Sequence, residues 1–351
     1  MTTKPETKTV SMSAPCRLDL GGTLDISTFF FPLRRFSPTT VNIALSMRTS
    51  ATVSPFDPGW VKVSSLGFEP ALFKIGEAPI THPMGLMFAI CEYFGADGFA
   101  IDIRSSSPPR SALGGSSVAA VALIAALMKA TGQNPEAQLP LDKIVLLAYA
   151  IESSVLRVPC GMQDQLAAAY GGVNAWCFTG DVAEVPYQRR VLIPKAGYGR
   201  LEQRIMAAYC GEPHESVNIN GKWVEHFMRG VDRQIWKDIM ECSSAFSEAL
   251  FQENYGEAAR WMNRETDIRM GMTPDVLDNT GKQLAEAARQ RDCGVRFTGA
   301  GGGGCVWALG EADNLGHLRN DWSEILGQNP NAGFLDVKID GDGLREETVQ
   351  G

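Results

Sequence analysis

Apolar and polar residues alternate along three early stretches of the chain, residues 10–20, 41–53 and 99–103. Alternation with a period of two is typical of β-strands that bury one face. Turn-forming Pro and Gly residues separate the stretches, as in S-P-F-D-P-G-W at residues 54–60. The first third of the chain is therefore predicted to form a β-rich layer.

From residue 116 the pattern changes to segments rich in Ala and Leu, at residues 118–130, 142–156 and 161–172. These compositions favour helices, which we expect to pack on the predicted sheet. Longer and more polar helices are predicted at residues 231–251, 255–270 and 274–292. Two strand-like segments follow, 294–298 and 305–309, with a glycine string between them. The predicted domains are residues 1–190 and 191–351.

Composition narrows the function classes. The 351 residues carry 32 Lys+Arg and 40 Asp+Glu, a net charge of −8, which does not favour nucleic acid as a partner. The longest apolar run, residues 118–128, is shorter than the roughly 17–25 residues of a membrane span, and the start of the chain is polar. We expect a soluble cytoplasmic protein with no membrane partner.

The eight cysteines and four histidines do not form a metal-binding pattern. The sequence contains no C-x-x-C pair and no H-E-x-x-H, so a helix-borne metal site lacks a ligand set. The cysteines are predicted to be buried thiols. Glycine is more frequent than in an average protein, with 36 residues, and many of these glycines lie in clusters.

One glycine cluster belongs to the segment 105–117, S-S-S-P-P-R-S-A-L-G-G-S-S, which leads into an apolar helix. Consecutive small residues before a helix N-terminus expose backbone N–H groups to an anion, which favours a phosphate site. The Walker A pattern is absent from the sequence. The alternative is an ordinary loop with a Ser N-cap.

Two acidic residues, Glu152 and Asp164, lie twelve positions apart across a Pro-Cys-Gly turn. If both face the predicted anion site, one suits Mg²⁺ binding and the other suits acceptance of a hydroxyl proton. The alternative is a pair of solvated charges.

The glycine string F-T-G-A-G-G-G-G-C-V-W begins at Phe297 and contains G-x-G-x-x-G at Gly299, Gly301 and Gly304. A dinucleotide site would require a helix directly after it. A strand pattern follows instead, which argues against hydride transfer with a nicotinamide.

Taken in order, these motifs resemble the GHMP kinase superfamily of galactokinase, homoserine, mevalonate and phosphomevalonate kinases. The opening A-P-C-R-L-D-L-G-G-T-L-D (14–25) is similar to the family's sugar-binding motif. Residues 108–117 are similar to its P-P-G-x-G-L-G-S-S phosphate loop, and residues 297–305 to its third motif. The segment V-P-C-G-M-Q-D-Q (158–165) resembles the galactokinase-type segment that carries the catalytic Asp. The overlapping segment Q-D-Q-L-A-A-A-Y-G-G-V-N (163–174) most resembles the branch of heptose 7-phosphate kinases and fucokinase-like enzymes.

The resemblance implies an α+β fold of two domains, a β-rich N-terminal domain with packed helices and a ferredoxin-like C-terminal domain, with ATP in the cleft between them. It implies an ATP-dependent sugar kinase that uses Mg²⁺ and acts on a sugar or sugar phosphate, with a homodimer as one option for assembly. Asp164 is implied as the catalytic base and Arg17 as its partner, and Ser116 and Glu152 as magnesium ligands. The implied ATP-binding residues are Leu113, Gly114, Gly115, Ser116 and Ser117, and the implied substrate-binding residues are Asp25, Gly22, Gly301 and Gly302.

The chain departs from the family pattern at Arg110 and Ala112, where the phosphate loop usually has glycines. Two alternative functions stay open, a catalytically weak sensor of ATP and sugar and a GHMP-fold diphosphate decarboxylase. Arg34 and Arg35, downstream of the opening motif, are candidates for reading an anionic group on the substrate because paired guanidinium groups suit phosphate.

Overall fold

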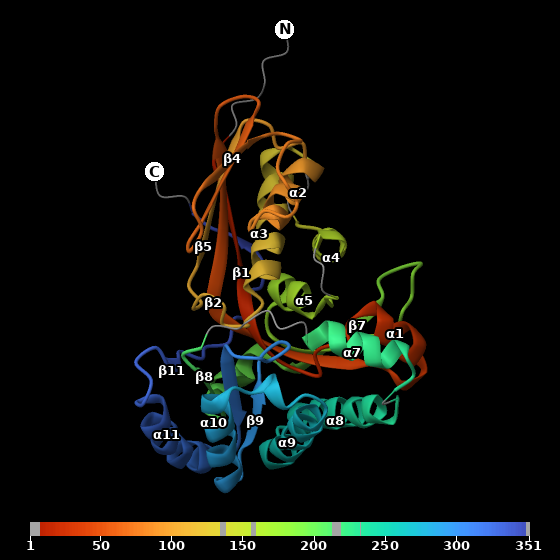
Figure 1. Ribbon diagram of the computed structural model, residues 1–351, viewed down its shortest axis with the longest axis vertical. Coiled ribbons are helices and arrows are strands. Elements are labelled where there is room, and N and C mark those ends of the chain that lie inside the picture. The colour runs from red at the N-terminus through yellow and green to blue at the C-terminus, as the bar shows by residue number, and fades with distance from the viewer. Residues whose placement is uncertain (1–7, 134–137, 156–158, 213–218, 232, 349–351) are drawn as a thin grey trace.

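The computed structural model describes residues 8–133, 138–155, 159–212, 219–231 and 233–348. Two sheets, each covered by helices, make up an α+β architecture (Figure 1). Most of the larger sheet and its helices form the upper part of that view, and the smaller sheet with its helices, coloured from green to blue, forms the lower part.

The larger sheet has eight strands in the described part of the chain, in the order β12-β1-β2-β5-β3-β4, with β6 pairing to β2 and β7 to β6. Its central pair is antiparallel, with Val10 opposite Val53 and Leu20 opposite Val41. The strands are β1 (Val10–Leu20), β2 (Thr39–Pro55), β3 (Trp60–Ser65), β4 (Ala71–Lys74), β5 (Phe99–Ser105), β6 (Val173–Phe178), β7 (Tyr187–Ile193) and β12 (Arg345–Glu346). The three early strands that alternation predicted are confirmed as β1, β2 and β5.

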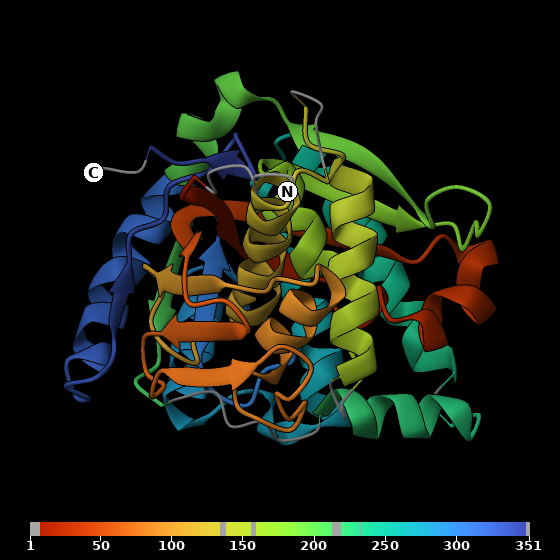
Figure 2. The ribbon, with the colours of Figure 1, turned by 90° about the horizontal axis from the view of Figure 1, so that it is seen from above.

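Helices cover one face of this sheet, and Figure 2 shows them from above. α3 is the central one, and its residues from Ser117 to Leu127 are all buried. The longest apolar run of the sequence is therefore a core helix. The helices around it are α2 (Gly85–Tyr93), α3 (Gly115–Ala130), α4 (Leu141–Val155) and α5 (Gln163–Tyr170).

The smaller sheet is antiparallel, in the order β11-β8-β10-β9. Along the chain its elements run strand, helices, strand, strand, helix, strand, which is the ferredoxin-like arrangement predicted for the C-terminal part. The strands are β8 (Ile205–Tyr209), β9 (Gly294–Phe297), β10 (Cys305–Leu309) and β11 (Gly333–Leu335). The helices of this part are α7 (Ile219–Met228), α8 (Arg233–Phe251), α9 (Tyr255–Met272), α10 (Asn279–Gln290) and α11 (Ala312–Leu326).

Two short helices, α1 (Ser27–Leu33) and α6 (Tyr198–Glu202), and three 3₁₀ turns, at Arg34–Phe36, Lys195–Gly197 and Pro274–Val276, complete the described elements. The bounds of the helix predicted at residues 274–292 are wrong, because α10 spans only Asn279–Gln290. Asp278 is extended and caps the N-terminus of α10 by accepting a hydrogen bond from the Gly281 N–H, so the helix begins after it.

The domain boundary at residues 190 and 191 stays a prediction. It falls inside β7, and the C-terminal strand β12 returns to pair with β1 in the larger sheet. No helix within the described ranges combines the length and the apolar composition that a membrane crossing needs.

Candidate functional site

A cavity of about 620 Å³ opens where the end of β1, the start of α3 and the start of α5 meet. Most of the residues that the sequence analysis assigned to catalysis, metal binding and nucleotide binding line it. These are Arg17, Asp25, Leu113, Gly114, Gly115, Ser116, Ser117, Glu152 and Asp164. The fold thus brings together residues that lie up to about 150 positions apart in the sequence.

The predicted phosphate loop ends at Gly114, which is the N-cap of α3 and has a φ of 82°. The first intrahelical bond runs from the Val118 N–H to the Gly114 carbonyl. The N–H groups of Gly115, Ser116 and Ser117 precede that bond, as the first amides of any helix do, and they lie at the positive end of its dipole. The loop can therefore hold an anion with backbone donors.

Arg110 and Ala112 both have a positive φ, 53° and 59°. The loop thus keeps at these two positions a backbone conformation that glycine adopts most readily, although neither residue is glycine. This accounts for the glycines of the family pattern. Arg110 also lines the cavity.

Asp164, in the first turn of α5, accepts a hydrogen bond on Oδ1 from Arg17 Nε at 2.8 Å. Its other oxygen, Oδ2, lies against the phosphate loop, because a Cβ placed on Gly114 would be 3.0 Å from it. Burial raises the pKa of Asp164 above its usual value, and the Arg17 guanidinium opposes that rise. The pairing with Arg17 is as the resemblance implies, but burial has the larger effect on the pKa of this carboxyl.

Glu152, on α4, is buried with an exposed fraction of 3%. Its Oε2 accepts a hydrogen bond from Gln165 Nε2 at 2.6 Å. Burial raises its pKa to about 7, while the Ser117 and Ser116 hydroxyls lower it. No ion pair of Glu152 with Lys, Arg or His is present among the described residues.

A buried carboxylate without a cationic partner, next to a serine hydroxyl, suits a hard divalent cation. Within the described ranges no three His, Cys, Asp or Glu side chains gather as a metal site. Glu152 and Ser116 therefore fit Mg²⁺ as part of a shell that other oxygen ligands, such as phosphate, complete.

Asp25 also lines the cavity, and its carboxylate holds two segments together. Its Oδ1 accepts from the Thr23 N–H at 2.9 Å, and its Oδ2 accepts from the Gln163 N–H at 2.9 Å. Burial raises its pKa to about 6. A Cβ on Gly161 would lie 1.7 Å from Asp25 Oδ2, so only glycine fits at that position. Asp25 is thus anchored at the cavity rather than solvated.

Comparison with known proteins places these residues in a family. The model of the family described as GHMP kinases N terminal domain matches residues 82–172, which include the phosphate loop, Glu152 and Asp164. Residues 82–172 are a GHMP kinase N-terminal domain. The resemblance found in the sequence is thereby confirmed.

The curated relatives belong to the branch that the sequence indicated. The chain is 24% identical over 233 residues to the bifunctional fucokinase/GDP-fucose pyrophosphorylase of Arabidopsis thaliana, a match that covers 65% of this chain and 21% of that protein. It is 24% identical over 314 residues to the D-glycero-alpha-D-manno-heptose 7-phosphate kinase of Campylobacter jejuni, covering 86% of this chain and 89% of that protein. The chain thus spans about a fifth of the first relative and most of the second.

Solved structures confirm the GHMP kinase fold over nearly the whole chain. The D-glycero-D-manno-heptose 1-phosphate kinase from Bacteroides thetaiotaomicron superimposes with a TM-score of 0.73 at 18% identity, covering 97% of this chain and 100% of that one. The galactokinase of Lactococcus lactis gives a TM-score of 0.74 at 17% identity, covering 96% and 95%.

Three glycines that the sequence analysis assigned to substrate binding do not line the cavity. Gly22 uses its carbonyl to accept from Arg269, the Gly301 N–H donates to the Thr298 carbonyl, and the Gly302 N–H donates to the Val276 carbonyl. Their neighbours line it instead: Thr23, Gly299 and Ala300. Arg34 and Arg35 are exposed and lie outside the cavity lining.

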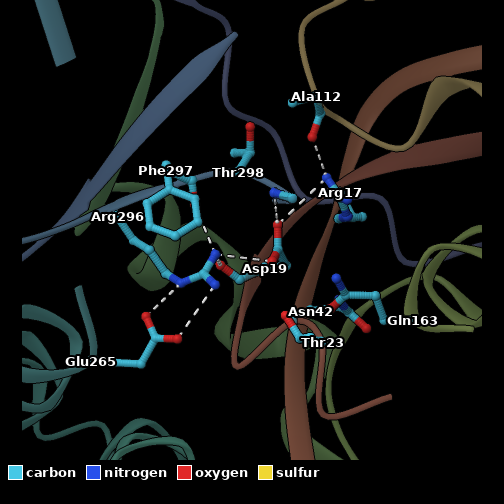
Figure 3. A network of polar contacts seen from close by, with 12 residues as sticks. Arg17, Asp19, Thr23, Asn42, Ala112, Gln163, Glu265, Arg296, Phe297 and Thr298 are labelled. Atoms are coloured by element: carbon cyan, nitrogen blue, oxygen red, sulfur yellow. Dashed lines mark hydrogen bonds and ion pairs between the residues drawn. The ribbon is translucent and has the colours of Figure 1, made fainter. Parts of the chain in front are cut away.

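A buried chain of ion pairs runs from the cavity into the C-terminal part, and sequence reasoning missed it (Figure 3). Arg17 lies 3.5 Å from Asp19, Asp19 Oδ2 accepts from Arg296 Nη1 at 3.0 Å, and Arg296 Nε donates to Glu265 at 2.9 Å. Glu265 also accepts from Arg269 Nε at 2.9 Å. The only signal in the sequence is the Glu265 and Arg269 spacing of four on a predicted helix, which is equally common on exposed helix faces.

Proposed function

We propose that the chain is an ATP-dependent kinase that transfers the γ-phosphoryl group to a hydroxyl of a sugar or sugar phosphate. One observation carries the proposal. Asp164 is fixed by Arg17 on one oxygen and presents the other oxygen to the anion-binding loop at Gly114. A base placed beside a phosphate cradle is the arrangement that phosphoryl transfer to a hydroxyl needs.

Asp164 would accept the proton of the attacking hydroxyl on Oδ2, because Oδ1 already accepts from Arg17. Burial raises its pKa, which makes it a better proton acceptor than an exposed aspartate as long as it is ionised. Arg17 donates a second hydrogen bond, to the Ala112 carbonyl, at 2.6 Å. The same guanidinium thus orients the base and ties it to the phosphate loop.

The backbone N–H groups from Gly115 to Ser117 would bind phosphate oxygens at the N-terminus of α3. Glu152 and Ser116 would hold Mg²⁺ there. The ion would supply neutralisation of the charge on the phosphates. Because the pKa of Glu152 is about 7, this carboxyl is ionised most fully when a cation is bound beside it.

The cavity also extends between apolar side chains of α2 and β5, including Met84, Leu86, Met87 and Ile103. An apolar slot continuous with a phosphate cradle suits a nucleobase. Asp25, Thr23 and Gln163 line the cavity with polar atoms and would contact the sugar.

A coupled assay of ADP release tests the proposal. It would screen D-galactose, L-fucose and D-glycero-D-manno-heptose 7-phosphate with Mg·ATP, and would include the Asp164→Asn variant to exclude a contaminating kinase. We expect sugar-dependent ADP release by the wild type for at least one of these compounds and a large loss in the variant. ADP release that no sugar stimulates, or that the variant retains in full, would refute the proposal.

A further inference from the structure

Thr23 adopts a backbone conformation that its side chain disfavours. Its φ is 88°, although threonine is β-branched, and its exposed fraction is 6%. Such a residue is a true conformational outlier, and it persists only where its surroundings hold it. Thr23 also lines the cavity, so the unusual conformation lies at the proposed site.

Arg269 is the group that holds it. Arg269 Nη1 donates to Thr23 Oγ1 at 3.1 Å, and Arg269 Nη2 donates to the Gly22 carbonyl at 2.6 Å. One guanidinium therefore binds both the backbone carbonyl of Gly22 and the side-chain hydroxyl of Thr23, the residue that follows it. On the far side of the turn, the Thr23 N–H donates to Asp25, which itself lines the cavity.

Arg269 is in turn fixed in place. It is fully buried, and its Nε donates to Glu265 Oε1 at 2.9 Å. Its guanidinium carbon lies 4.6 Å from the ring centre of Trp223 and 5.1 Å from that of Trp236. Glu265 continues the ion-pair chain to Arg296 (Figure 3). Helix α9 of the C-terminal part thus presents a rigid fork of donors to the opening loop of the N-terminal part.

We propose that Arg269 is a positioning residue that fixes residues 21–25 so that Thr23 and Asp25 face the substrate. The identity of the ligand rests on the proposed function, whereas the order of the loop does not. A lysine at position 269 keeps the charge but has no planar fork, so it cannot bind Gly22 and Thr23 in the same way.

Hydrogen exchange of the peptide that spans residues 21–26 in the whole protein, without ligand, is the first measurement. We expect Arg269→Lys and Thr23→Val to raise its exchange rate by about tenfold or more, because each removes a bond that holds the loop. Thr23→Ser keeps the hydroxyl and should exchange like the wild type. The matched control is Arg264→Lys on the same helix, whose side chain is half exposed and pairs with Glu241 at 3.6 Å.

The second measurement is the split between KM and kcat, with the sugar that ranks first among D-galactose, L-fucose and heptose 7-phosphate. We expect Thr23→Val to raise the KM for the sugar about tenfold, and the KM for ATP less than threefold, with Thr23→Ser close to the wild type. Unchanged exchange of residues 21–26 in both Arg269→Lys and Thr23→Val, or an unchanged sugar KM in Thr23→Val, overturns the inference. If the wild type phosphorylates no sugar, the proposed function fails, and exchange alone decides whether Arg269 positions the loop.

Discussion

Replacing Glu152 by Gln should stabilise the protein while it removes a proposed magnesium ligand. Burial raises the pKa of this carboxyl from 4.5 to about 7. The folded state therefore binds a proton more readily than the unfolded chain between these two values. The stabilising contribution of the protonated form is complete below pH 4.5 and is lost as the pH rises through 7.

The size of the effect follows from the linkage of protonation and folding. Above pH 7 the charged form costs the folded state about 3 kcal/mol, and at pH 5 about 1 kcal/mol. Glutamine mimics the neutral form, and its amide can donate to Gln165 Oε1, a buried atom that finds no hydrogen-bond partner among the described residues. We therefore expect Glu152→Gln to raise the unfolding midpoint by about 5 °C at pH 8 and by only about 1–2 °C at pH 5.

Thermal unfolding of wild type and variant from pH 5 to pH 8 is the assay. The control is Glu324→Gln, an exposed glutamate on α11, which should leave the midpoint unchanged at every pH. Adding MgCl₂ with a non-hydrolysable ATP analogue should raise the wild-type midpoint more than that of Glu152→Gln. A variant that melts below the wild type at pH 8 would refute the claim that the ionised form of Glu152 destabilises the folded protein when no cation is bound.

Further substitutions test the packing around the site. Gly161→Ala should lower the free energy of unfolding by about 1–3 kcal/mol and raise the sugar KM, because the new methyl group overlaps Asp25. The control is Gly316→Ala in α11, where a new methyl group meets no atom within 4 Å. This control should leave stability in the same melts unchanged or slightly higher. Arg296→Met should lower stability by about 3–5 kcal/mol in urea titrations, because it removes the cation that the buried carboxylates Asp19 and Glu265 share and leaves each with one remaining arginine. The exposed Arg104→Met should show no measurable change. Equal effects of the two substitutions would contradict the importance of the buried ion pairs.

Local sequence signals were sufficient for much of the fold. β1, β2 and β5 were predicted from alternation, and α3 from a segment rich in Ala and Leu. The glycine string was not interpreted as a dinucleotide site because a strand pattern follows it, and the structure confirms that strand as β10. The ferredoxin-like class of the C-terminal part came from the family resemblance and not from local signals, since pairing between β8 and β11 joins residues more than 120 positions apart.

The buried ion pairs could not be predicted because their sequence signal is that of an exposed surface. Asp19 alternates with Leu18 and Leu20, as a solvent-facing residue of a strand would. In the structure both faces of β1 are buried, so Asp19 meets Arg296 of the other sheet and not water. The assignment of Gly301 and Gly302 to substrate binding failed because the sequence does not show which glycines of the string face the cavity. Sequence cannot distinguish Gly299, which lines the cavity, from Gly301, whose N–H is used within the loop.

The most direct test of the proposed kinase mechanism is the turnover number of Asp164→Asn with saturating Mg·ATP and the preferred sugar. Asparagine keeps the size of the side chain and can still accept from Arg17, but it cannot take up the hydroxyl proton. We predict an intact fold, near-normal nucleotide binding and a kcat lower by roughly 10²–10⁴-fold. A loss of less than about fivefold with KM unchanged would contradict the account, because transfer would then proceed without a base at this position.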